Sequence, residues 1–330
     1  MTDRSRDRPP DAGAALATDA DLCHAYRLFL GRDPDEAGLA HYRRRLSEGL
    51  TLSALAEAFR GSDEHRQCRE RDRLTHETTV DLGGYQVVVD RRDPDFGADL
   101  AHWRVYEEPV RQVVRDRLAS GDVCLDIGAN VGVITLLAAT LVGPEGRVIA
   151  VEPNPDNVQL LYQGMLVNRC ANVEVLPLAA SDHRAVFTMT GRSNTEISAP
   201  AAPGRPGRLT QSVVLDDVLP DVPRLDLVKL DIEGHEPAAL RGLERLVARH
   251  HPTLLVEFNP RCLERHGEDP RALLEWLLAR YANLRAVSHF GDDATFTDPD
   301  ALLAFWRRRD AALTAEGRLP AGLLHFDLAT

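Results

Sequence analysis

Several features are scarce or missing in this chain of 330 residues, and each absence argues against a class of protein. No apolar run approaches the roughly 20 residues that a membrane-spanning helix needs. The polar first twenty residues lack the apolar core of a signal peptide. The five cysteines lie far apart without a C-x-x-C pair, which disfavours a zinc or redox motif. We therefore expect a cytoplasmic protein with free thiols and no membrane insertion.

A surplus of positive charge is also absent. The formal net charge is −12, and the arginines are scattered among acidic residues rather than gathered into a basic block. Nucleic acids and anionic membranes attract basic patches, so neither is expected as the main partner. The length and the apolar content suit a globular chain with one large domain and a small one.

Lysine is the rarest basic residue, because Lys229 is the only one among 39 lysines and arginines. It lies in Val228-Lys-Leu-Asp-Ile-Glu-Gly-His-Glu236, where an apolar strand pattern runs into several ionisable groups. Arginine is bulkier and stays charged, so a lone lysine inside a strand suggests a function that a guanidinium would perform badly. Ligands bind at the carboxyl ends of strands in open α/β sheets. The segment therefore predicts an enzyme site.

The chain divides into a helical region and a longer α/β region. Helical periodicity runs from 19 to 73. The region 78–330 opens with a predicted hairpin at 78–90 and then alternates short apolar runs with helices. That alternation predicts an α/β fold with a doubly wound, mainly parallel, Rossmann-like sheet. Residues 1–18 are interpreted as a disordered tail. The Pro/Gly/Arg segment 199–208 predicts a flexible loop, either a substrate lid or a plain surface insertion.

The predicted sheet is built from short apolar runs with helices between them. A last strand near the C-terminus closes it, and the expected helices follow the first, second, fourth and fifth strands. The strands are predicted at 121–127, 147–152, 173–178, 226–231, 253–258 and 323–328, and the helices at 131–142, 155–168, 236–249 and 270–281.

The first strand ends in a glycine-containing turn. Glycines let a ligand press against the backbone, and helix N-terminal amides favour an anionic group. A dinucleotide site has G-x-G-x-x-G, but here only Gly128 and Gly132 are present and Asn130 takes the middle place. Asp126 would repel a pyrophosphate and suits a ligand that carries an amine and a sulfonium. NAD binding is therefore the disfavoured alternative.

Two other strand ends carry candidate ligand groups. Glu152 can accept hydrogen bonds from ribose hydroxyls, although an acid there can also serve the start of the next helix. Beyond the third strand, Ala179 and Ala180 are small enough to admit a flat base beside Ser181. Asp182 could then accept a hydrogen bond from an exocyclic amine, and an ordinary turn is the alternative.

These elements together carry a family resemblance. They resemble the FkbM family of S-adenosylmethionine-dependent methyltransferases over about residues 100–260. The resemblance implies a class I methyltransferase fold, S-adenosylmethionine as cofactor and, typically, O-methylation of hydroxyls on sugars, polyketides or other natural products. It gives cofactor roles to Asp126, Gly128, Asn130, Gly132 and Glu152. The matching segments are Asp126-Ile-Gly-Ala-Asn-Val-Gly132, Val151-Glu-Pro153, Leu215-Asp-Asp217, Lys229-Leu-Asp-Ile-Glu-Gly-His-Glu236 and Val256-Glu257.

The N-terminal region carries a second, shorter resemblance. Tyr26-Arg-Leu-Phe-Leu-Gly-Arg-Asp-Pro-Asp35 and Gly38-Leu-Ala-His-Tyr42 are similar to a small helical domain of unknown function in bacterial surface and secreted proteins. We expect this region to be a separate helical module that can dock a protein partner.

Methyl transfer is an in-line displacement, so alignment and a base are the catalytic requirements. Strand alternation puts Lys229, Asp231 and Glu233 on one side. Asp231 is the first choice for the group beside the acceptor hydroxyl. His235 is a candidate base or a solvated histidine. Lys229 either activates the acceptor oxygen or pairs with an acid, and Glu257 completes the catalytic set.

A metal is a further hypothesis for the same edge of the sheet. Asp231, Glu257 and Asn259 would lie on adjacent strand ends and offer oxygen ligands suited to Mg²⁺ or Ca²⁺. Such an ion could acidify an acceptor hydroxyl. Acids at strand ends also occur without a metal.

The sequence thus predicts a cytoplasmic S-adenosylmethionine-dependent O-methyltransferase that acts on a small molecule or a glycan. A nicotinamide-dependent oxidoreductase is the enzymatic alternative. The third alternative is a non-catalytic interaction protein that docks its partner through the helical module.

Overall fold

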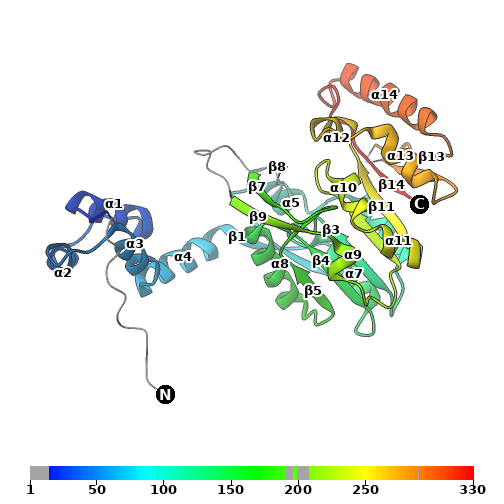
Figure 1. The fold of residues 1–330 in the computed structure, drawn as a ribbon. Coiled ribbons are helices and arrows are strands. Elements are labelled where there is room, and N and C mark those ends of the chain that lie inside the picture. The colour runs from blue at the N-terminus through cyan, green and yellow to red at the C-terminus, as the bar shows by residue number, and fades with distance from the viewer. Residues whose placement is uncertain (1–14, 95, 191–195, 199–207, 289) are drawn as a thin grey trace. The chain divides into compact units, whose positions relative to one another are not determined.

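The computed structural model describes residues 15–330 apart from 95, 191–195, 199–207 and 289. It divides into two compact units, with the division between Glu77 and Thr78 (Figure 1). Except for Arg208, the predicted lid segment 199–208 lies outside the described residues. No helix in the described ranges is long and apolar enough to cross a membrane.

The described part of the first unit, from residue 15 on, contains four helices, and side-chain caps define where three of them begin. Thr18, Asp35 and Thr51 each accept a hydrogen bond from the backbone amide three residues later. Such a cap satisfies one of the free amides of a helix start. The helices are α1 (Asp19–Leu30), α2 (Glu36–Ser47), α3 (Leu52–Arg60) and α4 (Asp63–His76).

An aromatic cluster forms the core of this unit. The fully buried Phe59 ring lies 4.9 Å from Tyr26, edge to face, and 5.1 Å from Tyr42, stacked. The chain before α1 joins the unit as well, because the Ala17 amide donates to the Leu50 carbonyl. Residues 15–18 of the predicted tail 1–18 therefore belong to the folded unit. Residues 1–14 lie outside the described ranges.

The second unit opens with the predicted hairpin region, which is a two-stranded sheet beside two helices. Asn168 ties this sheet to the main body, because its side chain accepts from the Gln86 amide and donates to the Gln86 carbonyl. The elements are β1 (Glu77–Asp81), β2 (Gln86–Asp90), α5 (Gly97–Trp103) and α6 (Glu108–Arg117).

An eight-stranded sheet is the centre of the second unit. Five neighbouring strands in it are parallel, and β14 runs antiparallel to both of its neighbours. This confirms the predicted doubly wound, mainly parallel α/β fold. The order in space is β13 (Ala294–Phe296), β12 (Leu284–Val287), β14 (Phe326–Ala329), β11 (Thr253–Phe258), β10 (Leu227–Leu230), β3 (Val123–Ile127), β4 (Arg147–Val151) and β5 (Val173–Leu176).

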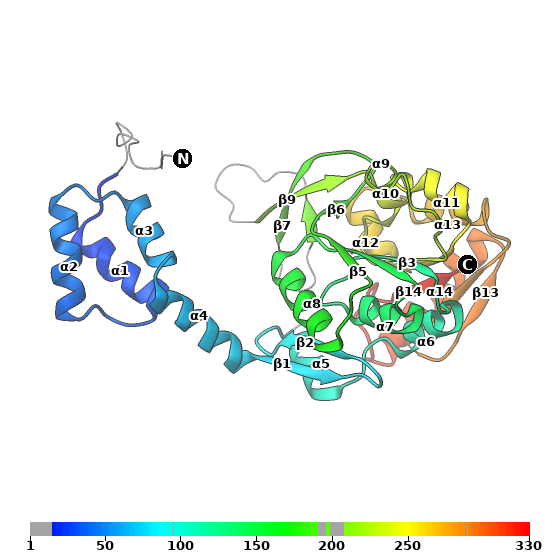
Figure 2. The same cartoon turned by 90° about the horizontal axis from the view of Figure 1, so that it is seen from below.

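Helices cover both faces of this sheet, as Figure 2 shows. Strand alternation supplies both cores: Cys124 packs into the core under α6, α7 and α8, and Leu125 into the opposite one. The first face carries α7 (Val133–Val142) and α8 (Pro155–Asn168). The other carries α9 (Leu215–Val218), α10 (Glu236–Arg241), α11 (Glu244–His250), α12 (Pro260–Arg265), α13 (Pro270–Leu278) and α14 (Pro299–Ala315).

The predicted third strand and the helix predicted at 236–249 both differ from the structure. The third strand ends at Leu176, and Ala179 and Ala180 belong to a separate four-stranded sheet. The single helix predicted at 236–249 is interrupted at Gly242, where a Cβ would lie 2.2 Å from the Ser181 carbonyl oxygen. That close approach keeps the two segments together. The small sheet contains β6 (Ala179–Ala180), β9 (Arg208–Val213), β7 (Val186–Thr190) and β8 (Glu196–Ser198), in this order.

Phe59→Ala should destabilise the first unit by about 3–5 kcal/mol, because it leaves a cavity among the aromatic rings. Hydrogen–deuterium exchange of the full chain should then be faster across residues 19–70. Leu28→Ala is the control, since this side chain is 78% exposed. Equal exchange in both variants would show that the aromatic cluster does not hold the unit together.

Candidate functional site

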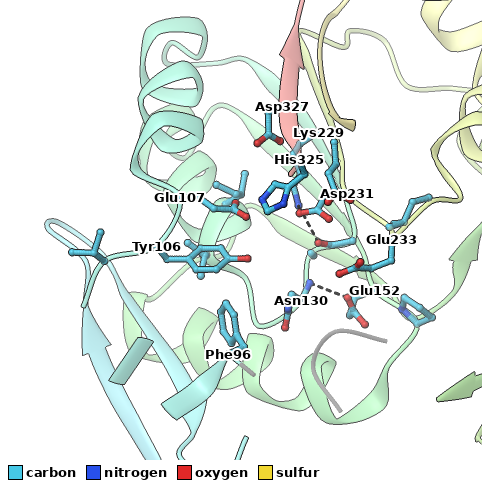
Figure 3. Close-up of a pocket in the computed structure, with 18 residues that line it drawn as sticks. Phe96, Tyr106, Glu107, Asn130, Glu152, Lys229, Asp231, Glu233, His325 and Asp327 are labelled. Atoms are coloured by element: carbon cyan, nitrogen blue, oxygen red, sulfur yellow. Dashed lines mark hydrogen bonds and ion pairs between the residues drawn. The ribbon is translucent and has the colours of Figure 1, made fainter. Parts of the chain in front are cut away.

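The strand order reverses between β3 and β10, because the chain leaves β3 toward β4 and later returns on the other side. Ligands of doubly wound folds bind at this switch point, beyond the carboxyl ends of the strands. A cavity of about 440 Å³ lies there, a size that suits a small-molecule ligand. Its walls come from Phe96, Val105, Tyr106, Glu107, Gly128, Ala129, Asn130, Val133, Ile134, Glu152, Pro153, Lys229, Asp231, Ile232, Glu233, Glu257, His325 and Asp327 (Figure 3).

The turn after β3 forms one wall, and Gly128 sets its shape. Its φ is +80°, and a Cβ there would lie 1.9 Å from the carbonyl oxygen of Asp231. Only glycine permits both the left-handed backbone and this close approach. Asn130 follows with φ +50°, and its buried side-chain oxygen has no hydrogen-bond partner within the described residues. Gly132 is the N-cap residue of α7, and a Cβ there would collide with the Leu161 side chain.

Glu152, just beyond the end of β4, holds the same turn from the side. One carboxylate oxygen accepts from the Asn130 amide at 2.8 Å, and the other accepts from the Asn154 amide at 2.8 Å. Burial raises the pKa of Glu152 to about 7, although these amide hydrogen bonds oppose the shift. A carboxylate has about four acceptor sites, so Glu152 keeps capacity for hydroxyl donors of a ligand.

Lys229 lies between two carboxylates at the centre of the site. Its Nζ is 3.2 Å from Asp231 and 4.0 Å from Asp126, and it donates to the Gly128 carbonyl at 3.3 Å. Burial alone would lower the pKa of Lys229, but the two carboxylates outweigh it and raise the pKa. Lys229 therefore stays cationic. Asp126 is fully buried behind it and accepts from the Thr135 hydroxyl at 2.5 Å.

Asp231 and Glu257 lie next to each other but differ in charge state. Burial would raise the pKa of Asp231, yet Lys229 outweighs it and lowers the pKa. Burial and the neighbouring carboxylates, Asp231 first among them, raise the pKa of Glu257 well above its usual range. The site thus offers an ionised carboxylate that can accept a proton and a carboxylic acid that can donate a hydrogen bond.

The side chains of the loop after β10 point to different places. Glu236 turns back, and its carboxylate accepts from the amides of Ile232 and Gly234. Glu233 lines the cavity, but His235 does not. The His235 ring lies 4.1 Å from that of His266. The structure thus does not bring the candidate base His235 to the other catalytic candidates.

Three more predicted residues lie outside this cavity. The Ser181 amide donates to the Val213 carbonyl, and Asp182 forms an ion pair with Arg241 at 2.7 Å and a hydrogen bond with the His183 ring at 2.6 Å. Both residues follow β6 of the small sheet rather than the third strand of the main sheet. Asn259 caps α12, because its side-chain oxygen accepts from the Cys262 amide.

This use of Asn259 bears on the metal hypothesis. Asp231 and Glu257 share the cavity, but Asn259 is not among its lining residues. Over the described ranges, no group of three or more His, Cys, Asp and Glu side chains is arranged to hold a metal ion. Asn259 thus serves as a helix cap outside the cavity, and metal binding by Asp231, Glu257 and Asn259 stays a prediction.

The predicted site residues do not include one side of the cavity. Tyr106 and Glu107 reach it from the segment before α6, Asp327 reaches it from β14, and His325 reaches it from just before β14 (Figure 3). Asp327 is paired in register with Glu257. The period-two pattern of the predicted last strand already put His325 and Asp327 on one face, so this signal was available.

The sheet and the switch-point cavity define a Rossmann-like domain with a site for a small-molecule ligand. Residues 126–285 match the family model of the methyltransferase FkbM domain, and residues 17–68 match the domain of unknown function DUF4214. These two matches confirm the two resemblances that the motifs carry.

Individual proteins show more distant similarity. The hexuronic acid methyltransferase AglP of Haloferax volcanii is 29% identical over 153 residues, which cover 43% of this chain and 59% of AglP. Methyltransferase FkbM from Methylobacillus flagellatus KT is 19% identical, with a TM-score of 0.38 over 59% of this chain and 58% of that one. Aeropyrum pernix fibrillarin, solved with natively bound S-adenosyl-L-methionine, is 14% identical, with a TM-score of 0.34 over 60% and 71%. The chain thus spans less than two thirds of its curated relative.

Lys229→Met should destabilise the second unit by about 3–5 kcal/mol, because two buried carboxylates lose their counter-charge. Adding Asp126→Asn should recover at least half of that loss, since one of the two charges is then removed. Urea denaturation of the single and double variants measures both effects. No recovery in the double variant would contradict the ion-pair account.

Gly128→Ala should also cost stability, at about 2–4 kcal/mol, because the new methyl group collides with the Asp231 backbone. Gly84→Ala is a matched control: its φ is +96° but a Cβ meets nothing within 4 Å. It should lose only about 1 kcal/mol, the cost of the left-handed backbone. Equal losses in the two variants, measured by thermal unfolding, would remove the steric argument.

Proposed function

We propose that the protein is an S-adenosylmethionine-dependent methyltransferase that transfers a methyl group to a hydroxyl of a sugar or another natural product. The observation that carries the proposal is the acid-rich cavity at the switch point, with a glycine turn on β3 and Glu152 beyond β4. A cavity rich in carboxylates suits a ligand with a sulfonium and an amine, and the FkbM domain match supports the same reading.

The residues of the cavity fit this cofactor. Gly128 has no Cβ to block it, the Asn130 side-chain oxygen is buried without a hydrogen-bond partner in the described ranges, and Glu152 has acceptor capacity left. In the proposal Glu152 binds the ribose hydroxyls, and the turn at Gly128 supports the amino-acid part. Asp126 acts indirectly, by holding Lys229.

When bound, the cofactor supplies an electrophilic methyl group. The other parts of the reaction fall to side chains over β10, β11 and β14. Asp231 is ionised beside Lys229, so it would accept the proton that the acceptor hydroxyl loses when its oxygen receives the methyl group. The electron pair of the broken carbon–sulfur bond would leave with S-adenosylhomocysteine. Glu257 can donate a hydrogen bond that orients the acceptor. The name of the relative AglP, a hexuronic acid methyltransferase, supports a sugar as the acceptor.

The test is calorimetric titration of the full chain with S-adenosylmethionine and, separately, with NAD⁺. We expect micromolar binding of S-adenosylmethionine that is lost in Glu152→Ala. Glu174→Ala is the control, because this glutamate is exposed and pairs with Arg147. Failure to bind S-adenosylmethionine would overturn the proposal, and heat from NAD⁺ would favour the oxidoreductase alternative.

Cofactor affinity should also depend on pH. The hydroxyls of ribose donate to the ionised form of Glu152, whose pKa is raised to about 7. Binding should therefore weaken as the pH falls through 7, by about tenfold from pH 8 to pH 6. Calorimetry at both pH values, with Glu152→Gln as the non-titrating variant, measures this. An equally steep pH dependence in Glu152→Gln would assign the effect to another group.

A further inference from the structure

The part of the cavity that lies away from Gly128 and Glu152 has a distinct character. It is formed by Tyr106 and Glu107 before α6, by His325 just before β14 and by Asp327 on β14, and Figure 3 shows these side chains together on one side. If the cofactor occupies the proposed place, this side receives the acceptor. Its chemistry therefore indicates the class of acceptor.

Negative charge dominates the lining. Six acidic side chains face one lysine and one histidine across the cavity. Burial and neighbouring carboxylates raise the pKa of Glu257 well above its usual range, so the negative charge comes from the other five. The single lysine adds little positive potential, because Lys229 is buried between Asp231 and Asp126, and Asp126 lies behind it. S-adenosylmethionine itself carries a net charge of only about +1 at neutral pH, so the walls remain negative after it binds. The six acidic residues are Glu107, Glu152, Asp231, Glu233, Glu257 and Asp327.

A second observation points to a ligand at this place. The Glu257 side chain is only 8% exposed, and its Oε2 atom has no hydrogen-bond partner within the described residues. Asp327 is 4% exposed and lies opposite Glu257 in the strand register. A buried polar atom without a hydrogen-bond partner is costly unless a ligand supplies that partner.

Aromatic rings complete this wall. Phe96 and Tyr106 pack edge to face with centroids 4.9 Å apart, and both line the cavity. Aromatic faces attract ammonium groups and also pack against sugar rings. Carboxylates beside aromatic rings are therefore complementary to a compact cation that carries N–H donors.

We infer that the acceptor is a hydroxylated molecule bearing an ammonium group, with an amino sugar as the best-fitting class, and that acceptors with a carboxylate are rejected. This inference rests on the proposed methyltransferase function. It also sets this chain apart from AglP, whose name specifies a hexuronic acid.

The experiment compares three methyl glycosides that differ at one position only: 6-amino-6-deoxyglucoside, glucoside and glucuronoside. A 2-amino-2-deoxyglucoside tests a second position for the ammonium group. Release of S-adenosylhomocysteine gives kcat/KM for each. An amino member should exceed the neutral glucoside by about tenfold and the glucuronoside by about a hundredfold.

Each other outcome has a defined meaning. Equal or better use of the glucuronoside, or no turnover of any glycoside by protein that binds S-adenosylmethionine, would overturn the inference. Absence of S-adenosylmethionine binding would instead overturn the proposed function, and calorimetry on the same sample separates the two cases.

Two variants test whether Asp327 and Glu107 cause this preference for an amino sugar. Asp327→Asn and Glu107→Gln should each lower the ratio of amino to neutral turnover by about tenfold, since each removes one negative charge. Glu107 lies at a half-buried position, so its variant remains informative if Asp327→Asn fails to fold. The exposed Asp221→Asn is the control. An unchanged ratio in the folded variants would contradict the inference.

Discussion

The ion-paired lysine at the switch point is the interaction on which the rest of the site depends. Lys229 on β10 is paired in register with Asp126 on β3, and its ammonium lies between that buried carboxylate and Asp231. Neither carboxylate is easily buried alone, because an uncompensated charge in a protein interior is costly. One cation therefore allows two acids to lie side by side at the carboxyl edge of the sheet, and this fixes Asp231 at the mouth of the cavity.

The acids around this pair stabilise backbone as well as facing a ligand. Glu152 accepts from the amides of the turn after β3, and Glu236 accepts from two amides of the loop after β10. These two turns touch where Gly128 meets the Asp231 carbonyl. The cavity is thus formed by loops that carboxylates hold in place, which explains how an acid-rich edge can remain ordered. It also explains why the same edge suits a cationic ligand.

The local parts of this arrangement could be predicted from the sequence. The strand endings at Asp126 and Glu152 and the glycine turn are encoded within a few residues. The structure brings the turn and Glu152 to one cavity and puts Asp126 behind Lys229. The sheet was predictable because its parallel strands are continuous apolar runs.

The remaining parts depend on contacts between distant segments. Tyr106 and Glu107 come from a segment without regular periodicity, and only the folded chain brings them opposite β10. His235 was expected beside Asp231, but the left-handed backbone at Glu233 and Gly234 turns it toward His266. Ser181 was predicted just beyond a third strand of the main sheet, but that strand ends at Leu176 and Ser181 follows a strand of the small sheet. A period-two pattern does not reveal such a change of sheet.

The central claim is that the carboxylate-lined cavity binds S-adenosylmethionine with its ribose at Glu152 and its methyl group toward Asp231. A crystal structure of the full chain grown with sinefungin, a stable analogue of the cofactor, tests it most directly. The account predicts ribose hydroxyls within hydrogen-bond distance of Glu152 and the amine that replaces the methyl group facing Asp231. Ribose density away from Glu152, or an analogue bound outside this cavity, would contradict it.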